Sequence, residues 1–293
     1  MGKKKWKKSE VMWGYFLIAP AISIIAIFAL VPVGYAIYYS FTDYSLFHPP
    51  YFIGLENFKE LFADEDFWQV VKNTLFYLIG VPVGLFVALF LASLLNDRTL
   101  KLAPLYRSIY FVPVILPMIS IGAVWIWIFN VKYGLMNHFL GLLGIKPIPW
   151  LTSYEWSKIP VIITGIWQGF GGSTIILLAG MQNIPGEVYE AAKLDGAGGM
   201  KMFFRITLPL LSQSIVVVTI MSVIASFQIF DLVMVLTGGG PGRSSASIVQ
   251  FIYEKAFRSF EMGYASAAAA LLFVVIFIVS IVQLKISQRI TNY

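Results

Sequence analysis

Long apolar stretches alternate with short polar segments along the whole chain, and this pattern predicts its architecture. A helix needs about 20 apolar residues to cross the hydrocarbon of a bilayer, and six stretches reach that length. The pattern therefore predicts an all-α membrane protein with six transmembrane helices. The expected spans are approximately 13–39, 71–95, 108–129, 160–181, 210–236 and 264–284.

Prolines and loop lengths are compatible with this division. Pro32, Pro82, Pro113 and Pro117 fall inside or near the expected spans, and membrane helices tolerate such breaks where neighbouring groups satisfy the freed carbonyls. The first stretch is too long for the apolar region of a signal peptide, so we expect it to remain as a helix. Since no loop is long enough for a second folded unit, residues 1–293 are expected to form one transmembrane domain.

Composition supports the membrane assignment. Hydrophobic residues make up 58% of the chain and charged residues only 12%. Soluble domains carry roughly 25% charged residues, so a soluble fold of this size could not cover its surface. The net charge of +6 comes largely from a basic tail, since five of the 21 basic residues lie in the first eight positions. Such a tail does not indicate a nucleic-acid surface.

The distribution of Lys and Arg predicts the orientation of the chain, because cytoplasmic loops are enriched in these residues. The N-terminal tail is expected in the cytoplasm, and an even number of spans returns the C-terminus to the same side. The second and fourth loops are then cytoplasmic, and the first external loop is acidic. The basic residues behind this orientation are Lys3, Lys4, Lys5, Lys7, Lys8, Arg98, Lys101, Arg107, Lys193, Lys201, Arg205, Lys285 and Arg289.

Several classes of chemistry lack the residues that they require. The chain has no Cys and two His residues, which argues against a structural zinc site or a thiol enzyme. It has no GxxxxGK(S/T) motif, so we expect it neither to hydrolyse ATP alone nor to bind a cofactor. Asp231 is the only carboxylate near the interior of an expected span, which argues against a proton relay. The sequence thus favours a transport subunit over an enzyme.

The segment from about 183 to 208 predicts two short helices. Pro185 suits the first turn of a helix, and Asp195-Gly196 should end that helix, because Gly enters the left-handed region without steric cost. We therefore expect a helix over 185–194 and a positive φ at Gly196. The small and apolar residues of this loop leave two alternatives, which are docking into a groove of a partner and lying on lipid.

Seven positions over 20 residues of this segment resemble a known motif. They have the spacing of the EAA loop of binding-protein-dependent ABC importer permeases. The matching residues are Glu190, Ala191, Ala192, Gly196, Ile206, Leu208 and Pro209. Segments 51–58, 73–74 and 236–241 also resemble the sugar branch of this family, and more narrowly the first permease subunit of maltose-type transporters.

The resemblance implies a type I ABC importer permease fold for nearly the whole chain, in a bacterial-type cytoplasmic membrane. It also implies that the loop forms a coupling helix seated in a cleft of an ATPase subunit. The residues expected to couple to that ATPase are Glu190, Ala191, Ala192, Asp195 and Gly196. The implied partners are a second, homologous permease, two ATPase subunits that use ATP and Mg²⁺, and an external solute-binding protein.

Polar and small residues on the expected fourth and fifth spans indicate where a solute could bind. Thr219, Ser222 and Ser226 share one helical face, and segment 167–172 combines Trp, Gln, Phe and Gly residues. The alternatives are hydroxyls bonded to carbonyls of the helices and a Gly-rich packing surface. The resemblance implies that six residues of the two spans line a central cavity. These are Gln168, Gly169, Gly172, Ser222, Ser226 and Ile229.

These features together predict the import of a sugar, either an oligosaccharide or a related sugar. Gln168, Gly172 and Ile229 differ in type from the residues of maltose carriers, so maltose itself is not singled out. A glycerol phosphate or another small polar solute is the main alternative, but phosphate recognition favours Arg or Lys, and these two spans contain neither. A stand-alone secondary carrier would leave the EAA loop unexplained.

Overall fold

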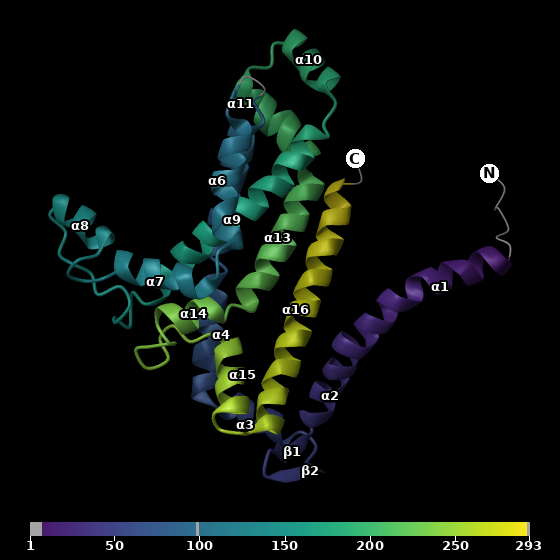
Figure 1. Cartoon of the computed structure of the whole chain (residues 1–293), viewed down its shortest axis with the longest axis vertical. Helices are drawn as coiled ribbons and strands as arrows, with labels where there is room; N and C mark the ends of the chain where they lie inside the picture. The colour runs from purple at the N-terminus through teal and green to yellow at the C-terminus, as the bar shows by residue number, and fades with distance from the viewer. Residues whose placement is uncertain (1–7, 98–99, 292–293) are drawn as a thin grey trace. The chain divides into compact units, whose positions relative to one another are not determined.

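The computed structural model describes residues 8–97 and 100–291, which are mostly helical (Figure 1). Among these residues, four helices are long and apolar enough to cross a membrane, and up to six spans result if each of two bent helix pairs counts as one. The prediction of an all-α membrane protein is confirmed, with one β-hairpin that the pattern did not predict. Five basic residues of the orientation argument lie outside the described residues: Lys3, Lys4, Lys5, Lys7 and Arg98.

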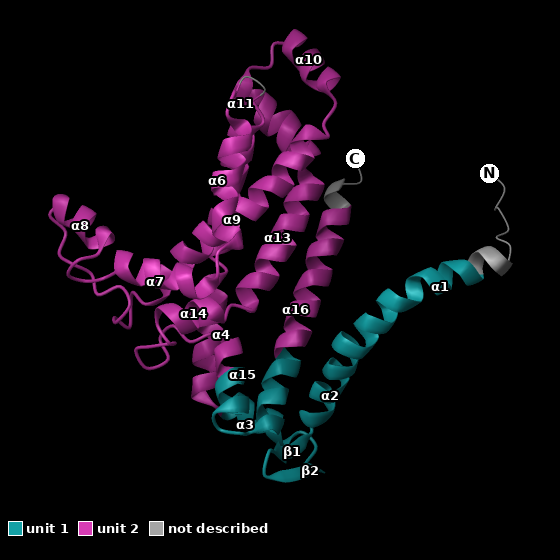
Figure 2. Cartoon of the chain, viewed as in Figure 1, with its two compact units in different colours: residues 1–63, 252–271 teal, residues 64–251, 272–293 magenta. Residues whose placement is uncertain are grey.

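The chain divides into two compact units, residues 1–63 with 252–271 and residues 64–251 with 272–293 (Figure 2). The elements of the first unit are α1 (Lys8–Ile25), a π-helical turn (Ala26–Leu30), α2 (Val31–Tyr39), β1 (Thr42–Ser45), β2 (His48–Phe52) and α3 (Glu56–Ala63). Two helices cross the boundary between the units, α15 (Ile248–Phe257) and α16 (Met262–Thr291).

The first unit combines an unpacked apolar span with a hydrogen-bonded hairpin. None of the residues of the span Met12–Tyr39 is buried. The hairpin pairs β1 with β2 in antiparallel register, so that Thr42 lies opposite Phe52. Asn57 of α3 holds its base, since its Nδ2 donates to the carbonyl oxygens of Ser40 at 3.0 Å and Thr42 at 2.9 Å.

The second unit contains most of the helices. Its elements are α4 (Glu65–Tyr77), α5 (Gly80–Leu95), α6 (Ala103–Ile115), α7 (Met118–Ile128), α8 (Leu135–Leu142), α9 (Lys158–Gln182), α10 (Gly186–Leu194), α11 (Gly199–Met202), a π-helical turn (Phe203–Thr207), α12 (Leu208–Leu210), α13 (Ser212–Phe227) and α14 (Asp231–Leu236).

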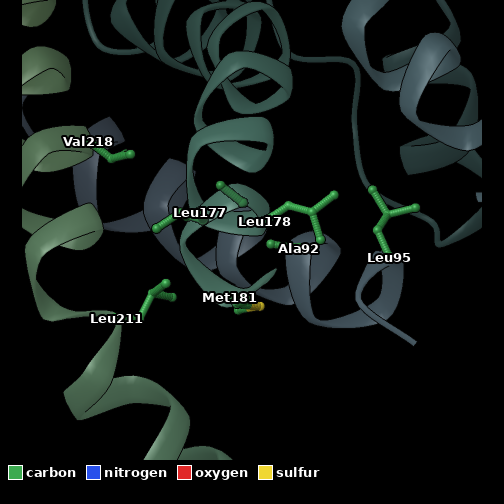
Figure 3. Packing of buried hydrophobic residues seen from close by; sticks show 8 residues of the cluster. Ala92, Leu95, Leu177, Leu178, Met181, Leu211 and Val218 are labelled. Carbon is green, nitrogen blue, oxygen red and sulfur yellow. The ribbon is translucent and has the colours of Figure 1, made fainter. Parts of the chain in front are cut away.

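Helix α9 is central to the second unit, because it packs against α5, α6, α13 and α14. Buried side chains from α5, α9 and α13 and from the turn before α13 form a common core (Figure 3). Its members are Ala88, Ala92, Leu95, Leu177, Leu178, Met181, Leu211 and Val218. Lipid tails are as apolar as these side chains, so close packing holds the helices together in a bilayer more than the exclusion of water does. The small Ala88 and Ala92 permit that close approach on α5.

The predicted third span is bent. Helices α6 and α7 meet at an angle of 97°, at a break between Ile115 and Met118. Leu116 has extended backbone angles, as expected for a residue that precedes a proline, and Pro117 has no amide hydrogen to continue the helix. A second bend of 70° separates Gly199–Leu210 from α13.

The predicted fifth span, 210–236, is not one helix. Helix α13 ends at Phe227, and α14 begins only at Asp231. Between them Gln228 leaves helical geometry with φ −96° and ψ 12°, and Phe230 follows with φ −135° and ψ −60°. No proline or glycine stands at this break. The segment that follows it, α14, packs against α7 and α9 (Figure 1).

Gly171 sets the distance between α6 and α9, and we expect Gly171→Ala to lower stability. A Cβ at this position would strike the backbone oxygen of Tyr110 and lie 3.0 Å from its carbonyl carbon. Backbone atoms cannot rotate away, so α6 must move, at a cost of about 1–3 kcal/mol. Thermal unfolding in detergent measures the effect.

Gly165→Ala is the matched control on the same helix. The nearest atom to a Cβ there is Leu232 Cδ1 at 3.5 Å, an ordinary contact, and Ala favours the helix by about 1 kcal/mol over Gly. Equal unfolding temperatures for the two variants would contradict the close approach at Gly171.

Candidate functional site

A cavity of about 290 Å³ lies within the second unit. Residues of α5, α9, α13 and α14 line it, and Tyr77 of α4 and Met118 of α7 complete the wall. The three residues at the break between α13 and α14 also line it, so the interruption of the predicted fifth span places irregular backbone against the cavity. Non-helical backbone at membrane depth is tolerated where it lines such a space or is buried in protein.

Five of the six residues expected to contact a solute lie around this cavity: Gln168, Gly169, Ser222, Ser226 and Ile229. The sixth, Gly172, is not among the lining residues, and a Cβ built there would meet no atom within 4 Å. The structure thus brings together residues of two expected spans on one space. Their role in binding stays a prediction.

Thr219 and Trp167 were also considered as solute contacts, but their side chains make contacts within the protein. The hydroxyl of Thr219 donates to the carbonyl oxygen of Ile215 at 2.7 Å, within its own helix. Trp167 packs edge-on against Trp125, with 5.6 Å between the ring centroids, and does not line the cavity. Thr219 and Trp167 therefore serve helix geometry and packing.

Several lining residues are not predicted from the sequence. Ser173 adds a hydroxyl from α9, one turn after Gly169, so helical spacing alone could have found it. Tyr77 comes from a different span, and only the folded chain brings it to the cavity. Asp231 had been noted only as evidence against a proton relay, and it lines the cavity at the start of α14. The lining therefore offers hydroxyls, amides, aromatic rings and a carboxylate.

The glycine-rich loop that follows α14 is held by polar side chains of α4. Asn73 Nδ2 donates to the carbonyl oxygens of Arg243 at 2.7 Å and Ala246 at 3.0 Å. The Tyr77 hydroxyl donates to the carbonyl oxygen of Ser245 at 2.5 Å. We call this set of contacts between α4 and residues 243–246 the loop clamp.

The loop itself needs glycine at its start. Gly238 and Gly239 have φ values of 61° and 87°, in the left-handed region. A side chain at Gly239 would also strike the amide group of Gln250, which is 1% exposed. The loop lacks the Lys-Ser/Thr pair of a phosphate-binding GxxxxGK(S/T) motif, and its described contacts are structural.

The expected coupling loop has the predicted local geometry. Helix α10 runs over Gly186–Leu194, close to the expected 185–194, and Gly196 has φ +74°, so the predicted positive φ is confirmed. Glu190, Ala191 and Asp195 are exposed. Leu194 is the most exposed apolar residue of the helix, at 90%.

Ala192 differs from its neighbours, because only 7% of it is exposed. We had expected it on the apolar surface of the loop, but it packs inside this chain. The reason is helical spacing, since Ala192 lies on the opposite side of α10 from Glu190 and Leu194. A charge at position 192 would therefore disturb the chain itself, and Ala191 is the better probe of an external contact.

We expect the Asn73→Leu variant to loosen the loop clamp. The change leaves one buried and one part-buried carbonyl oxygen without their donor, and the loss at a buried group costs about 1–3 kcal/mol. Hydrogen exchange of residues 238–247 and thermal unfolding in detergent should both report the loss.

Gln69→Leu provides the control, because Gln69 bonds only the Oδ1 atom of Asn73, at 3.1 Å, and leaves the loop carbonyls paired. Its cost should stay at about 0.5–1.5 kcal/mol. Unchanged exchange of the loop in Asn73→Leu would show that the clamp does not hold it.

Comparison with known proteins identifies the family. Residues 80–292 match the family described as the inner membrane component of binding-protein-dependent transport systems. The sulfoquinovosyl glycerol transport system permease protein SmoG of Agrobacterium fabrum is 38% identical over 92% of this chain and 88% of its own length. The trehalose/maltose transport system permease protein MalF of Thermococcus litoralis is 33% identical over 97% of this chain and 96% of its own length.

A solved structure supports the same assignment. A bacterial ABC transporter involved in the import of the acidic polysaccharide alginate contains a chain of TM-score 0.83 and 25% identity, covering 99% of this chain and 100% of that one. The family consists of membrane permease components and not of enzymes. The chain belongs to the family of inner membrane components of binding-protein-dependent transport systems.

Proposed function

We propose that this chain is a transmembrane permease subunit of an ATP-driven ABC importer that takes up a sugar, in particular an oligosaccharide. The observation that carries the proposal is the cavity. Its largely apolar lining includes hydroxyls, amides and aromatic rings, among them Ser222, Ser226, Gln168 and Phe170. Hydroxyl and amide groups pair with the many hydroxyls of a sugar, and rings offer flat apolar surfaces to its faces.

The printed names of the relatives support the same solute class. They include trehalose/maltose, lactose and multiple sugar-binding transport system permeases. The share of this chain that they cover exceeds nine tenths in each case, so the cavity and the loop both fall inside the matched regions. An external solute-binding protein that delivers the sugar follows from the family, whose transport systems depend on one.

The remaining partners are also proposals. A second, homologous permease would complete the pathway, and two ATPase subunits would bind ATP and Mg²⁺, since this chain has no nucleotide-binding motif and needs no cofactor of its own. The chain would cross the cytoplasmic membrane of a bacterial-type cell six times, with both termini in the cytoplasm. The basic residues near the second and fourth loops support that orientation.

Sugar uptake by the importer reconstituted with its partners tests the proposal. We expect Gln168→Leu and Ser226→Leu to lower uptake, because each removes a hydrogen-bonding group and Ser226→Leu also fills the cavity. One lost neutral hydrogen bond costs about 0.5–1.5 kcal/mol, which is roughly a twofold to tenfold change. Binding of sugar to the external protein should stay the same.

Thr219→Val is the control for these variants on α13. Its hydroxyl bonds inside the helix, so the variant should retain uptake at normal expression. If the purified chain hydrolysed ATP by itself, or if both cavity variants transported at the parent rate, the proposed function or the assigned cavity would be wrong.

The coupling loop has its own test. Gly196→Val places a β-branched residue at φ +74°, which strains the backbone by about 1–3 kcal/mol. Ala191→Asp instead adds a charge to an exposed face of α10. We expect both variants to insert normally, to lose uptake, and to retain less ATPase during co-purification.

Gly198→Val is the matched control, because Gly198 has φ −74° and ψ 170°, an extended conformation open to any residue. A Cβ there would meet no atom of the chain within 4 Å. Full ATPase retention in both Gly196→Val and Ala191→Asp would show that the loop only connects its neighbouring helices and does not hold the ATPase.

A further inference from the structure

The cavity carries one charged side chain. Among the described residues that line it, Asp231 is the only acidic one, and none is Lys or Arg. Asp231 is an exposed residue of this lining, and no hydrogen bond or ion pair to its carboxylate occurs within the described part of the chain. The carboxylate is therefore available to whatever enters the cavity.

The lysine at the start of α9 does not balance this charge, because its contacts lie elsewhere. Lys158, the first residue of α9, donates to the carbonyl oxygen of Ser244 at 3.0 Å and lies over the ring of Phe76 at 5.5 Å. It is not among the lining residues. A carboxylate in the first turn also suits the short helix α14, and this local preference does not neutralise its charge.

An unbalanced charge in a concave, largely apolar site acts strongly on a solute. Low-dielectric walls concentrate the field of a fixed charge, so a cavity with one negative group repels anions and attracts cations. Toward an uncharged sugar the same carboxylate is an acceptor for hydroxyl donors, and hydrogen bonds to a charged group are the stronger kind.

We propose that Asp231 is a charge filter of the cavity, which admits uncharged polyhydroxy solutes and disfavours anionic ones such as sugar phosphates and uronates. This inference rests on the proposed function for its solute class, but the field itself is a property of the chain. Such a filter argues against the glycerol phosphate alternative.

The chain contains no Cys, so a single introduced thiol can report the field inside the cavity. Ala225 lines the cavity and is exposed, and Ala225→Cys is a small change outside the predicted contact residues. The full chain in membranes with its partner subunits is treated with two thiol reagents of similar size. One is cationic, trimethylammonioethyl methanethiosulfonate, and the other is anionic, sulfonatoethyl methanethiosulfonate.

The measured quantity is the ratio of the cationic to the anionic reaction rate, divided by the same ratio for a free thiol in solution. Any effect of Asp231 on the ionisation of the thiol changes both rates equally and cancels in this ratio. We expect a ratio well above one for Ala225→Cys. Adding Asp231→Asn should lower this ratio on the order of threefold to tenfold. Raising the salt concentration should also lower the ratio.

Glu155→Gln is the control, because it removes the same charge from an exposed loop residue that does not line the cavity. It should leave the ratio unchanged. If Asp231→Asn does not fold, the ratio for Ala225→Cys alone decides. A ratio at or below one, or a ratio that Asp231→Asn does not alter, overturns the proposal, and neither result depends on whether the importer moves a sugar.

Discussion

Backbone groups that leave helical geometry inside a membrane protein must find partners within the protein, because hydrocarbon offers none. The segment between Phe227 and Ile248 is the main case in this chain. Asn73 and Tyr77 satisfy three of its carbonyl oxygens, and Thr74 accepts the amide of Ile248 at 3.0 Å. One face of α4 thus holds the glycine-rich loop that follows α14.

The same requirement explains where the small residues lie. Gly171 lets α9 touch the backbone of α6, and the alanines of α5 let α9 approach from another side. With α9 fixed on both flanks, Gln168 and Gly169 are presented to the cavity by rigid helix. A site built on helices in this way holds its polar groups more accurately than a site built on loops.

Sequence reasoning worked where the signal was local. The four long apolar spans, the short helix α10 and the positive φ of Gly196 follow from hydropathy and from the chemistry of one or two residues. Prolines were less informative, since Pro20 and Pro113 lie inside helices whereas Pro117 marks a sharp bend. Whether a proline breaks a membrane helix depends on its neighbours in space.

The missed features depend on contacts that are distant in sequence. Asn73 and Arg243 are separated by 170 positions, and no periodicity relates them. The break at Gln228 has no proline or glycine to mark it in the sequence, and the segment that follows it, α14, packs against α7 and α9. Five of the six residues that the family resemblance implied do line the cavity. The sequence did not indicate that Tyr77 is also part of the wall.

Tyr77 also joins two parts of the molecule that would otherwise be independent. Its side chain lines the cavity, and its hydroxyl holds Ser245 in the loop. A solute that displaces this side chain also changes the strength of that hydrogen bond. Thermodynamic linkage then requires the reverse: the state of the loop must alter the affinity of the cavity by the same factor. For such a solute, occupancy of the cavity and attachment of the glycine-rich loop would be coupled through the position of one side chain.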